Sequence, residues 1–128
     1  MMAARSSQGR RARISDEVLL VASARVRMLC EPMRIRLLLE LEEGGEATVQ
    51  QLADRLGTAH RNVSKHLNLL YDAGMVRRRK NGRQVCYGLV DYVALWVIEQ
   101  IANSAADHID QLHELFQDAD ADGAPESA

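Results

Sequence analysis

Apolar residues recur every three or four positions over most of this 128-residue chain, which is the spacing of an amphipathic helix. Ser15 and Thr48 stand where a side-chain oxygen can accept from the first turn of a helix, and Thr48 with Gln51 forms a capping box. Pro32 suits a first turn because the amide that proline lacks has no partner there. The pattern predicts successive helices over residues 15–30, 32–43, 48–56 and 60–72. The apolar face of the second, which we expect to lie in the core, comprises Ile35, Leu38, Leu39 and Leu41.

After Gly74 the period of the pattern changes from helical to extended. Two extended runs, residues 75–80 and 83–89, flank the pair Asn81-Gly82. Asn-Gly between extended runs is typical of a β-hairpin, since both central residues of a type I′ turn take positive φ. The tip carries cations rather than apolar residues, so we expect a basic two-stranded ribbon on the surface.

A last helix is predicted over residues 91–116, and its apolar positions alternate at spacings of three and four. They form a heptad seam, which favours packing against another helix at a shallow crossing angle. Ala102 and Ala105 would let two helices approach closely. The seam comprises Leu95, Ile98, Ala102, Ala105, Ile109, Leu112 and Phe116.

Residues 50–70, with the sequence QQLADRLGTAHRNVSKHLNLL, join the third and fourth helices. Ala53 is small enough for a helix crossing, Gly57 can take positive φ in the turn, and Val63 anchors the next helix. With Val63 and Leu67 facing inward, the rest of that helix offers the mostly cationic face that reading a DNA groove requires. The predicted fold class is mainly α with a small β-hairpin: a winged helix-turn-helix of four helices, two strands and a final helix.

The net charge of −2 hides an uneven distribution. Residues 59–83 carry seven Lys and Arg against one Asp, whereas residues 91–128 carry nine acidic residues and no Lys or Arg. Positive charge concentrated on the helix-turn-helix and the hairpin argues for nucleic-acid binding, although the overall pI does not.

The length suits one domain, over residues 14–116, between a disordered basic arm at 1–13 and a disordered acidic tail at 117–128. No apolar run approaches the ~20 residues of a membrane span. We therefore expect a cytoplasmic protein that does not bind membranes, with Cys30 and Cys86 reduced. No Ser/His/Asp or Cys/His arrangement, phosphate-binding Gly loop or pair of carboxylates stands out, so we do not expect an enzyme.

The chain resembles the ArsR/SmtB family of bacterial winged-helix repressors in three segments: residues 30–38 (CEPMRIRLL), 63–76 (beginning VSKHL and ending AGMV) and 81–87 (NGRQVCY). The resemblance covers about residues 15–116. It implies a homodimer joined through the first and last helices, with each recognition helix in the major groove of an inverted repeat, and repression until an effector weakens the complex. The implied dimer interface comprises Val18, Val21, Leu95, Ile98, Ala102, Ala105, Ile109 and Leu112.

The chain departs from the family's known sensor sites. Residues 48–54, where many members carry a Cys-containing metal motif, have no thiol. On the last helix Asp91 matches one family ligand, but Val93 stands where a His would follow. Cys30 and Cys86 also do not match the cysteine pair of persulfide sensors.

Candidate DNA contacts divide by chemistry. Arg61 and Asn62 suit base edges, since a guanidinium can pair with guanine and an amide with adenine. Ser64 and Lys65 suit phosphate, while His66 either contacts a base or braces the fold. The full set of expected DNA-binding residues is His60, Arg61, Asn62, Ser64, Lys65, His66, Arg79, Lys80 and Arg83.

Two alternatives remain open. One is a metal-responsive switch that uses the last helix, whose nitrogen and oxygen donors would suit zinc, nickel or cobalt. Its weak candidate ligands are Asp91, Asp107, His108, Asp110, His113 and Glu114. The other is a winged-helix module that binds protein instead of DNA.

Overall fold

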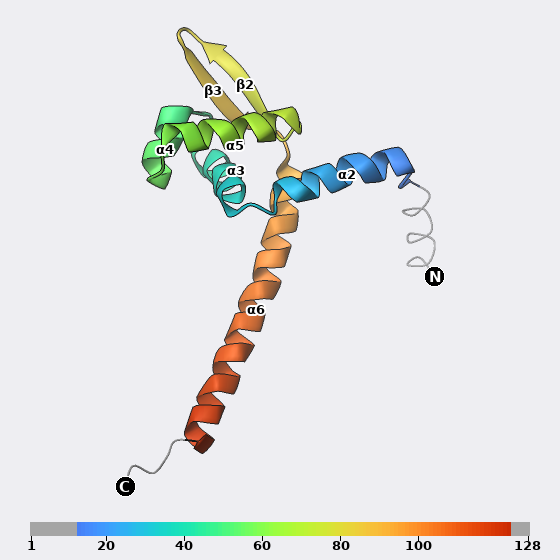
Figure 1. Cartoon of the computed structure of the whole chain (residues 1–128), viewed down its shortest axis with the longest axis vertical. Coiled ribbons are helices and arrows are strands. Elements are labelled where there is room, and N and C mark those ends of the chain that lie inside the picture. Colours follow the sequence, from blue (N-terminus) through green and yellow to red (C-terminus); the bar gives the residue numbers. More distant parts are fainter. Residues whose placement is uncertain (1–12, 124–128) are drawn as a thin grey trace. The chain divides into compact units, whose positions relative to one another are not determined.

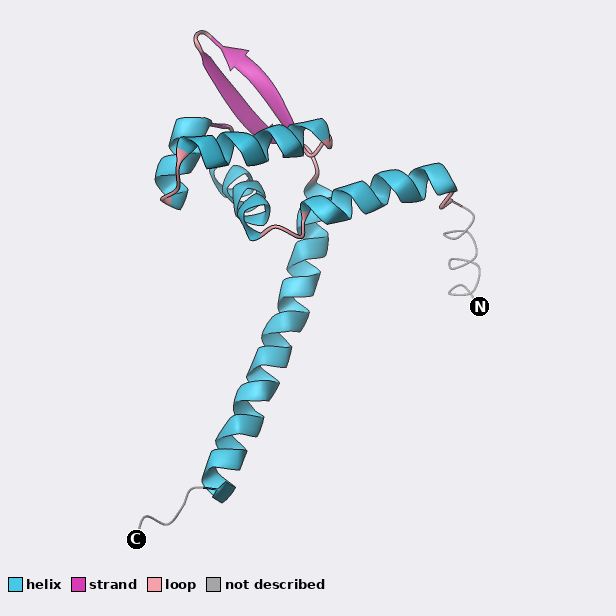
Figure 2. Cartoon of the chain, viewed as in Figure 1, coloured by secondary structure: helices cyan, strands magenta, loops and turns pink. Residues whose placement is uncertain are grey.

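The computed structural model describes residues 13–123, and their side chains as far as Ala119. The predicted arm lies outside this range except for Arg13. The elements in chain order are α2 (Asp16–Met28), α3 (Pro32–Gly44), β1 (Ala47–Thr48), α4 (Val49–Leu56), α5 (His60–Asp72), β2 (Val76–Asn81), β3 (Gln84–Leu89) and α6 (Tyr92–Gly123) (Figure 1). The fold class is as predicted, helical with one small sheet (Figure 2). The chain divides after Leu95 into two units.

Two of the predicted helix starts, those of α2 and α4, are confirmed by their side-chain caps. The Ser15 hydroxyl accepts from the Val18 amide at 3.2 Å at the start of α2. The capping box of α4 is complete, because Thr48 Oγ1 accepts from the Gln51 amide at 3.2 Å and Gln51 Oε1 accepts from the Thr48 amide at 3.0 Å. Each bond satisfies an amide that the helix itself leaves unpaired.

The helix-turn-helix is formed by α4 and α5. Gly57 ends α4 in the left-handed region, at φ 62° and ψ 37°, and its amide donates to the Ala53 carbonyl. Against these helices α3 buries Leu37, Leu38 and Leu41, while Ile35 and Leu39 are only half-buried. Leu39 still packs against the core, so the expected core face of α3 is confirmed for Leu38, Leu39 and Leu41. It was wrong for Ile35, and it missed Leu37. Between α3, α4 and α5, the buried side chains include Leu52, Ala53, Val63, Leu67 and Leu70.

The hairpin of β2 and β3 is extended by β1 into an antiparallel sheet with the order β1-β3-β2. Pairing of Asn81 with Gln84 leaves Gly82 and Arg83 as the two-residue loop. The expected type I′ turn centred on Asn81-Gly82 was therefore wrong, because among residues 13–123 positive φ occurs only at glycines, and Gly82 has φ 65°. One positive φ at the first loop position is the requirement of a type II′ turn. Sequence reasoning missed β1, since two residues cannot show alternation.

The start of α6 packs in the first unit. Asp91 caps the helix, with its Oδ1 accepting from the Ala94 amide at 3.0 Å. Leu95 is 1% exposed, so its assignment to a dimer interface was wrong: it belongs to the core of its own chain.

Beyond Leu95, α6 continues to Gly123 rather than ending near Phe116. No Gly or Pro interrupts residues 92–122, and alanine is the strongest helix former. The helix thus enters the predicted acidic tail, of which residues 124–128 lie outside the described range. None of the described helices is long and apolar enough to cross a bilayer.

Candidate nucleic-acid interface

The exposed face of α5 begins at its first turn. His60, Arg61 and Lys65 are exposed, and Ser64 is half-buried. On the opposite face Val63, Leu67 and Leu70 are fully buried, as a period of 3.6 residues requires. The hydrophobic contacts of one side of α5 therefore hold its polar side toward solvent.

Two amides of α5 have defined positions. Asn62 is half-buried, and its Nδ2 donates to Thr58 Oγ1 at 3.4 Å, which holds the side chain over the helix-turn-helix turn. Asn68 is exposed and lies one turn beyond Ser64 and Lys65 on the same face. Sequence reasoning omitted Asn68, although its spacing from Ser64 and Lys65 is a signal that could have found it.

His66 does not belong to the exposed face. It is 9% exposed, and its Nδ1 accepts from Arg34 Nε of α3 at 3.3 Å. Burial, with the nearby positive charge of Arg34, lowers the pKa of His66 below its ordinary value and so disfavours the charged ring. Its assignment to the DNA contacts was wrong, and the alternative that it braces the fold is the one observed.

The hairpin of β2 and β3 is the wing of the fold. On one of its faces, Glu46 binds two arginines of β2. Arg79 Nη2 donates to Glu46 Oε2 at 2.6 Å, and Arg77 donates from Nη2 and Nε to Oε1 at 3.1 and 3.2 Å. Bonds from Arg79 and Arg77 hold the pKa of Glu46 below its usual range. Arg77 also donates to the Leu89 carbonyl at 3.0 Å. Arg79, expected to meet phosphate, thus already has a carboxylate partner.

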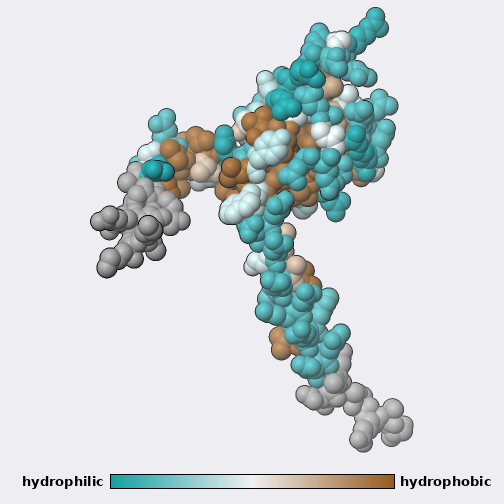
Figure 3. Space-filling view, turned by 180° about the vertical axis from the view of Figure 1, so that it is seen from behind, coloured by the Kyte–Doolittle hydropathy of each residue, from teal (hydrophilic) through white to brown (hydrophobic). Residues whose placement is uncertain are grey.

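The remaining cations of the hairpin have other environments. Lys80 is exposed near the end of β2 and Arg83 is exposed in the turn, where hydrophilic side chains cover the hairpin tip (Figure 3). The Arg78 guanidinium lies 4.2 Å from the centre of the Tyr71 ring, a cation–π contact between β2 and α5.

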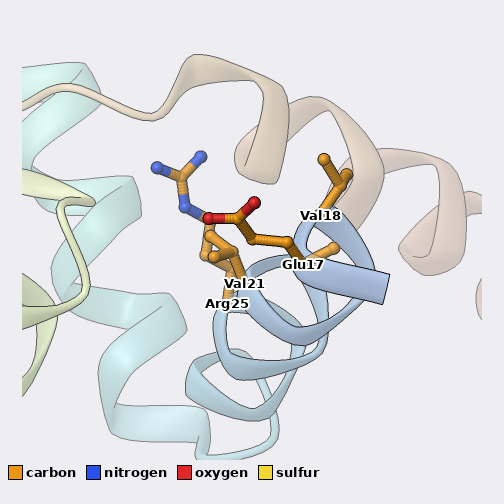
Figure 4. A pocket seen from close by; sticks show the side chains of 5 residues that line it. Glu17, Val18, Val21 and Arg25 are labelled. Carbon is orange, nitrogen blue, oxygen red and sulfur yellow. The ribbon is translucent and has the colours of Figure 1, made fainter. Parts of the chain in front are cut away.

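Exposed apolar side chains lie on two other elements. On α2 no residue is buried, and Val18 and Val21 are 49% and 53% exposed. With Glu17 and Arg25 they line a shallow hollow on one side of the helix (Figure 4). On α6, Ile98 is half-buried, and the other interface candidates beyond it are exposed: Ala102, Ala105, Ile109 and Leu112.

The candidate metal ligands are not assembled by this chain. Over residues 13–119, no three His, Cys, Asp or Glu side chains lie close enough together to hold an ion. Asp91, the one match to a family ligand, caps α6 and lies 3.8 Å from Arg25 Nη1. The donors of the described residues thus do not fit a closed metal site within one chain.

A helix-turn-helix with an exposed polar second helix, followed by a cationic hairpin, defines a winged-helix DNA-binding protein. Residues 29–79 match a family model described as a helix-turn-helix domain. The chain is 36% identical over 94 residues to the HTH-type transcriptional repressor SmtB of Mycobacterium tuberculosis, covering 73% of this chain and 69% of SmtB. The chain therefore belongs to the ArsR/SmtB family of winged helix-turn-helix transcriptional regulators, which are not enzymes.

Solved structures have the same fold. The crystal structure of the AntR antimony-specific transcriptional repressor matches with a TM-score of 0.65 at 25% identity, over 77% of this chain and 88% of AntR. The homodimeric winged helix-turn-helix domain of Mb0332 from Mycobacterium bovis, a possible ArsR-family regulator, matches with a TM-score of 0.61 at 22% identity, over 73% of this chain and 85% of that domain.

Proposed function

We propose that this protein is a homodimeric transcriptional repressor that binds an inverted-repeat operator in double-stranded DNA, acting in the cytoplasm. The observation that carries the proposal is the exposed polar face of α5 beside a cationic wing. SmtB is named as a repressor, which supports a role in repression. The Mb0332 domain is described as homodimeric, which supports a dimer. The two recognition helices of the dimer would lie about 34 Å apart, one turn of DNA.

Within this proposal α5 reads sequence and the wing supplies charge. Arg61 and Asn62 would contact base edges in the major groove, where a guanidinium pairs with guanine and an amide with adenine. The phosphate contacts would be His60, Ser64, Lys65, Lys80 and Arg83. If Lys65, Lys80 and Arg83 each neutralise a phosphate in both subunits, the logarithm of the binding constant should fall with log salt at a slope of about −5.

The dimer would bury the apolar side chains that one chain leaves exposed. A helix such as α2, with no buried residue and half-exposed valines, needs a covering surface to account for its composition. The proposed interface combines α2 and α6 through Val18, Val21, Ile98, Ala102, Ala105, Ile109 and Leu112.

The decisive experiment locates the operator and then removes Arg61. Footprinting on the region upstream of the protein's own gene should protect two half-sites. On that operator Arg61→Ala should weaken binding by about 1–3 kcal/mol and reduce the preference over random duplex, since a bidentate base contact is lost. Fluorescence anisotropy measures both affinities.

The matched control is Arg36→Ala, which removes an exposed arginine from α3. It should leave the preference for operator unchanged. If the Arg61 variant bound operator and random DNA as the wild type does, the assignment of α5 to base reading would be wrong.

Effector-linked release is a separate proposal. AntR is named for antimony, whereas the candidate donors of this chain on α6 (Asp107, His108, Asp110, His113 and Glu114) would suit zinc, nickel or cobalt. Titration of dialysed protein with these ions tests it. Binding of about one ion per subunit that His113→Ala abolishes would support it, and the lack of binding would remove it.

A further inference from the structure

Four consecutive cations, Arg77 to Lys80, occupy β2, and strand geometry separates them onto two faces. Side chains alternate along a strand, so Arg77 and Arg79 share one face while Arg78 and Lys80 share the other. Glu46 binds the first pair, and Tyr71 of α5 contacts Arg78. The second face is therefore the one turned toward the recognition helix.

Arg77 and Arg79 are largely engaged in contacts within the chain. Arg77 crosses its strand partner Gly88 so closely that a Cβ on that glycine would lie 2.7 Å from the guanidinium carbon. Three of its nitrogens donate to Glu46 or to the Leu89 carbonyl. Arg79 shares the same carboxylate. In the free protein, the negative charge of Glu46 thus offsets half of the positive charge of Arg77 and Arg79.

Arg78 has a different environment. It is exposed, no carboxylate among the described residues lies within ion-pair distance of it, and its guanidinium faces the ring of Tyr71, which is itself 39% exposed. Stacking on an aromatic face leaves the N–H edge of a guanidinium available for a phosphate. Side-chain hydrogen bonding to Tyr87, and more weakly to Tyr71, also raises the pKa of Arg78. The two tyrosines thus fix the direction of the side chain, which remains exposed to solvent.

The position of Arg78 continues the exposed face of α5. Tyr71 follows Asn68 by three residues and Ser64 by seven, so it lies near the end of the same face. The Tyr87 hydroxyl, on the strand partner of Arg78, lies 3.5 Å from Asn68 Oδ1. These contacts join α5 to the wing at the point where Arg78 projects.

We propose that Arg78 binds a DNA phosphate at the junction of the recognition helix and the wing, and that Tyr71 is its positioning residue. This inference rests on the proposed function, because it assigns a further contact within the same DNA interface. It also makes Arg78, rather than its neighbour Arg79, the phosphate ligand in the middle of β2.

The test compares Arg78→Gln with Arg79→Gln, which remove the same charge from adjacent positions on opposite faces. Binding to a fixed duplex is measured from low to moderate salt. Each lost phosphate contact reduces the slope of log K against log salt by about 0.9, so Arg78→Gln should reduce the slope of a dimer by about 2. Arg79→Gln should change it by clearly less, and Arg78→Lys, which keeps the charge, should retain most of it.

Tyr71 variants test the positioning role. Tyr71→Leu should weaken binding about 2- to 5-fold at one salt concentration with little change in slope, since a surface cation–π contact is lost but the charge stays. Tyr71→Phe keeps the ring and should bind as the wild type does.

The outcomes separate the inference from the proposed function. If the wild type binds no DNA at low salt, the proposed function is contradicted. A wild type that binds with a steep slope, together with an unchanged slope for Arg78→Gln or a larger loss for Arg79→Gln, overturns the inference alone. Because Arg78→Lys keeps the side chain's reach, a folded Lys variant with the Gln variant's slope would also overturn it.

Discussion

His66 links two helices through a partly buried polar contact. The ring of this α5 residue accepts from Arg34 of α3, and Arg34 also lies 3.6 Å from Met28 Sδ at the end of α2. A neutral imidazole can accept this bond, whereas a protonated ring would face the guanidinium as a like charge. At the scale of single residues, protonation of His66 is therefore expected to weaken this contact between α3 and α5.

Stability should fall as the pH decreases below about 6.5, the ordinary pKa of histidine. The unfolded chain binds the proton at that pH while the folded chain resists it, because burial and then Arg34 oppose the charge, with Lys65 adding to Arg34 and Glu31 acting in the opposite direction. Urea unfolding from about pH 8 to about pH 5 measures the effect, a range that stays above the titration of Glu46.

His66→Gln can still accept from Arg34 but cannot titrate, so it should lose most of this pH dependence. His60→Gln, which removes an exposed imidazole from the same helix, is the matched control and should keep it. An equal pH dependence in all three proteins would contradict the role assigned to the buried ring.

At the scale of elements, two glycine turns set the geometry of the DNA-binding unit. Gly57 directs α5 away from α4, and Gly82 closes the wing. Both take positive φ, and a Cβ on either would meet nothing within 4 Å. Any cost of substitution there comes from the backbone rather than from crowding.

Gly57→Ala should lower the free energy of unfolding by about 1–2 kcal/mol, the cost of the left-handed conformation for a residue with a Cβ. Gly57→Asn should cost less, because asparagine tolerates this region better. Chemical denaturation measures both. Equal stability of the Ala variant and the wild type would show that the turn relaxes to a different conformation.

The whole molecule distributes charge and apolar surface to different parts of the chain. Cations gather on α5 and the wing, while exposed apolar side chains gather on α2 and along α6. A single chain thus leaves apolar side chains in water that a second copy could cover. Dimerisation and DNA binding are accordingly expected to respond to different substitutions.

Ala105→Glu should separate the proposed dimer, since it places a charge where two helices would approach closely. Sedimentation at micromolar concentration measures the mass. Asn103→Glu adds the same charge to α6 off the seam and should remain dimeric. An Ala105 variant that stayed dimeric would show that the subunits meet elsewhere.

Local signals in the sequence determined the helix starts, the turn at Gly57, the existence of the wing and the family, because caps, glycines and apolar periods act over a few residues. The contacts and burial of individual side chains were decided by the tertiary structure. His66 meets an arginine 32 residues earlier, Arg79 meets a carboxylate 33 residues earlier, and Leu95 enters the core of its own chain. Partners so distant in the sequence are brought together only by folding, so a pattern of charges can predict a basic face but not which of its cations remain available for DNA.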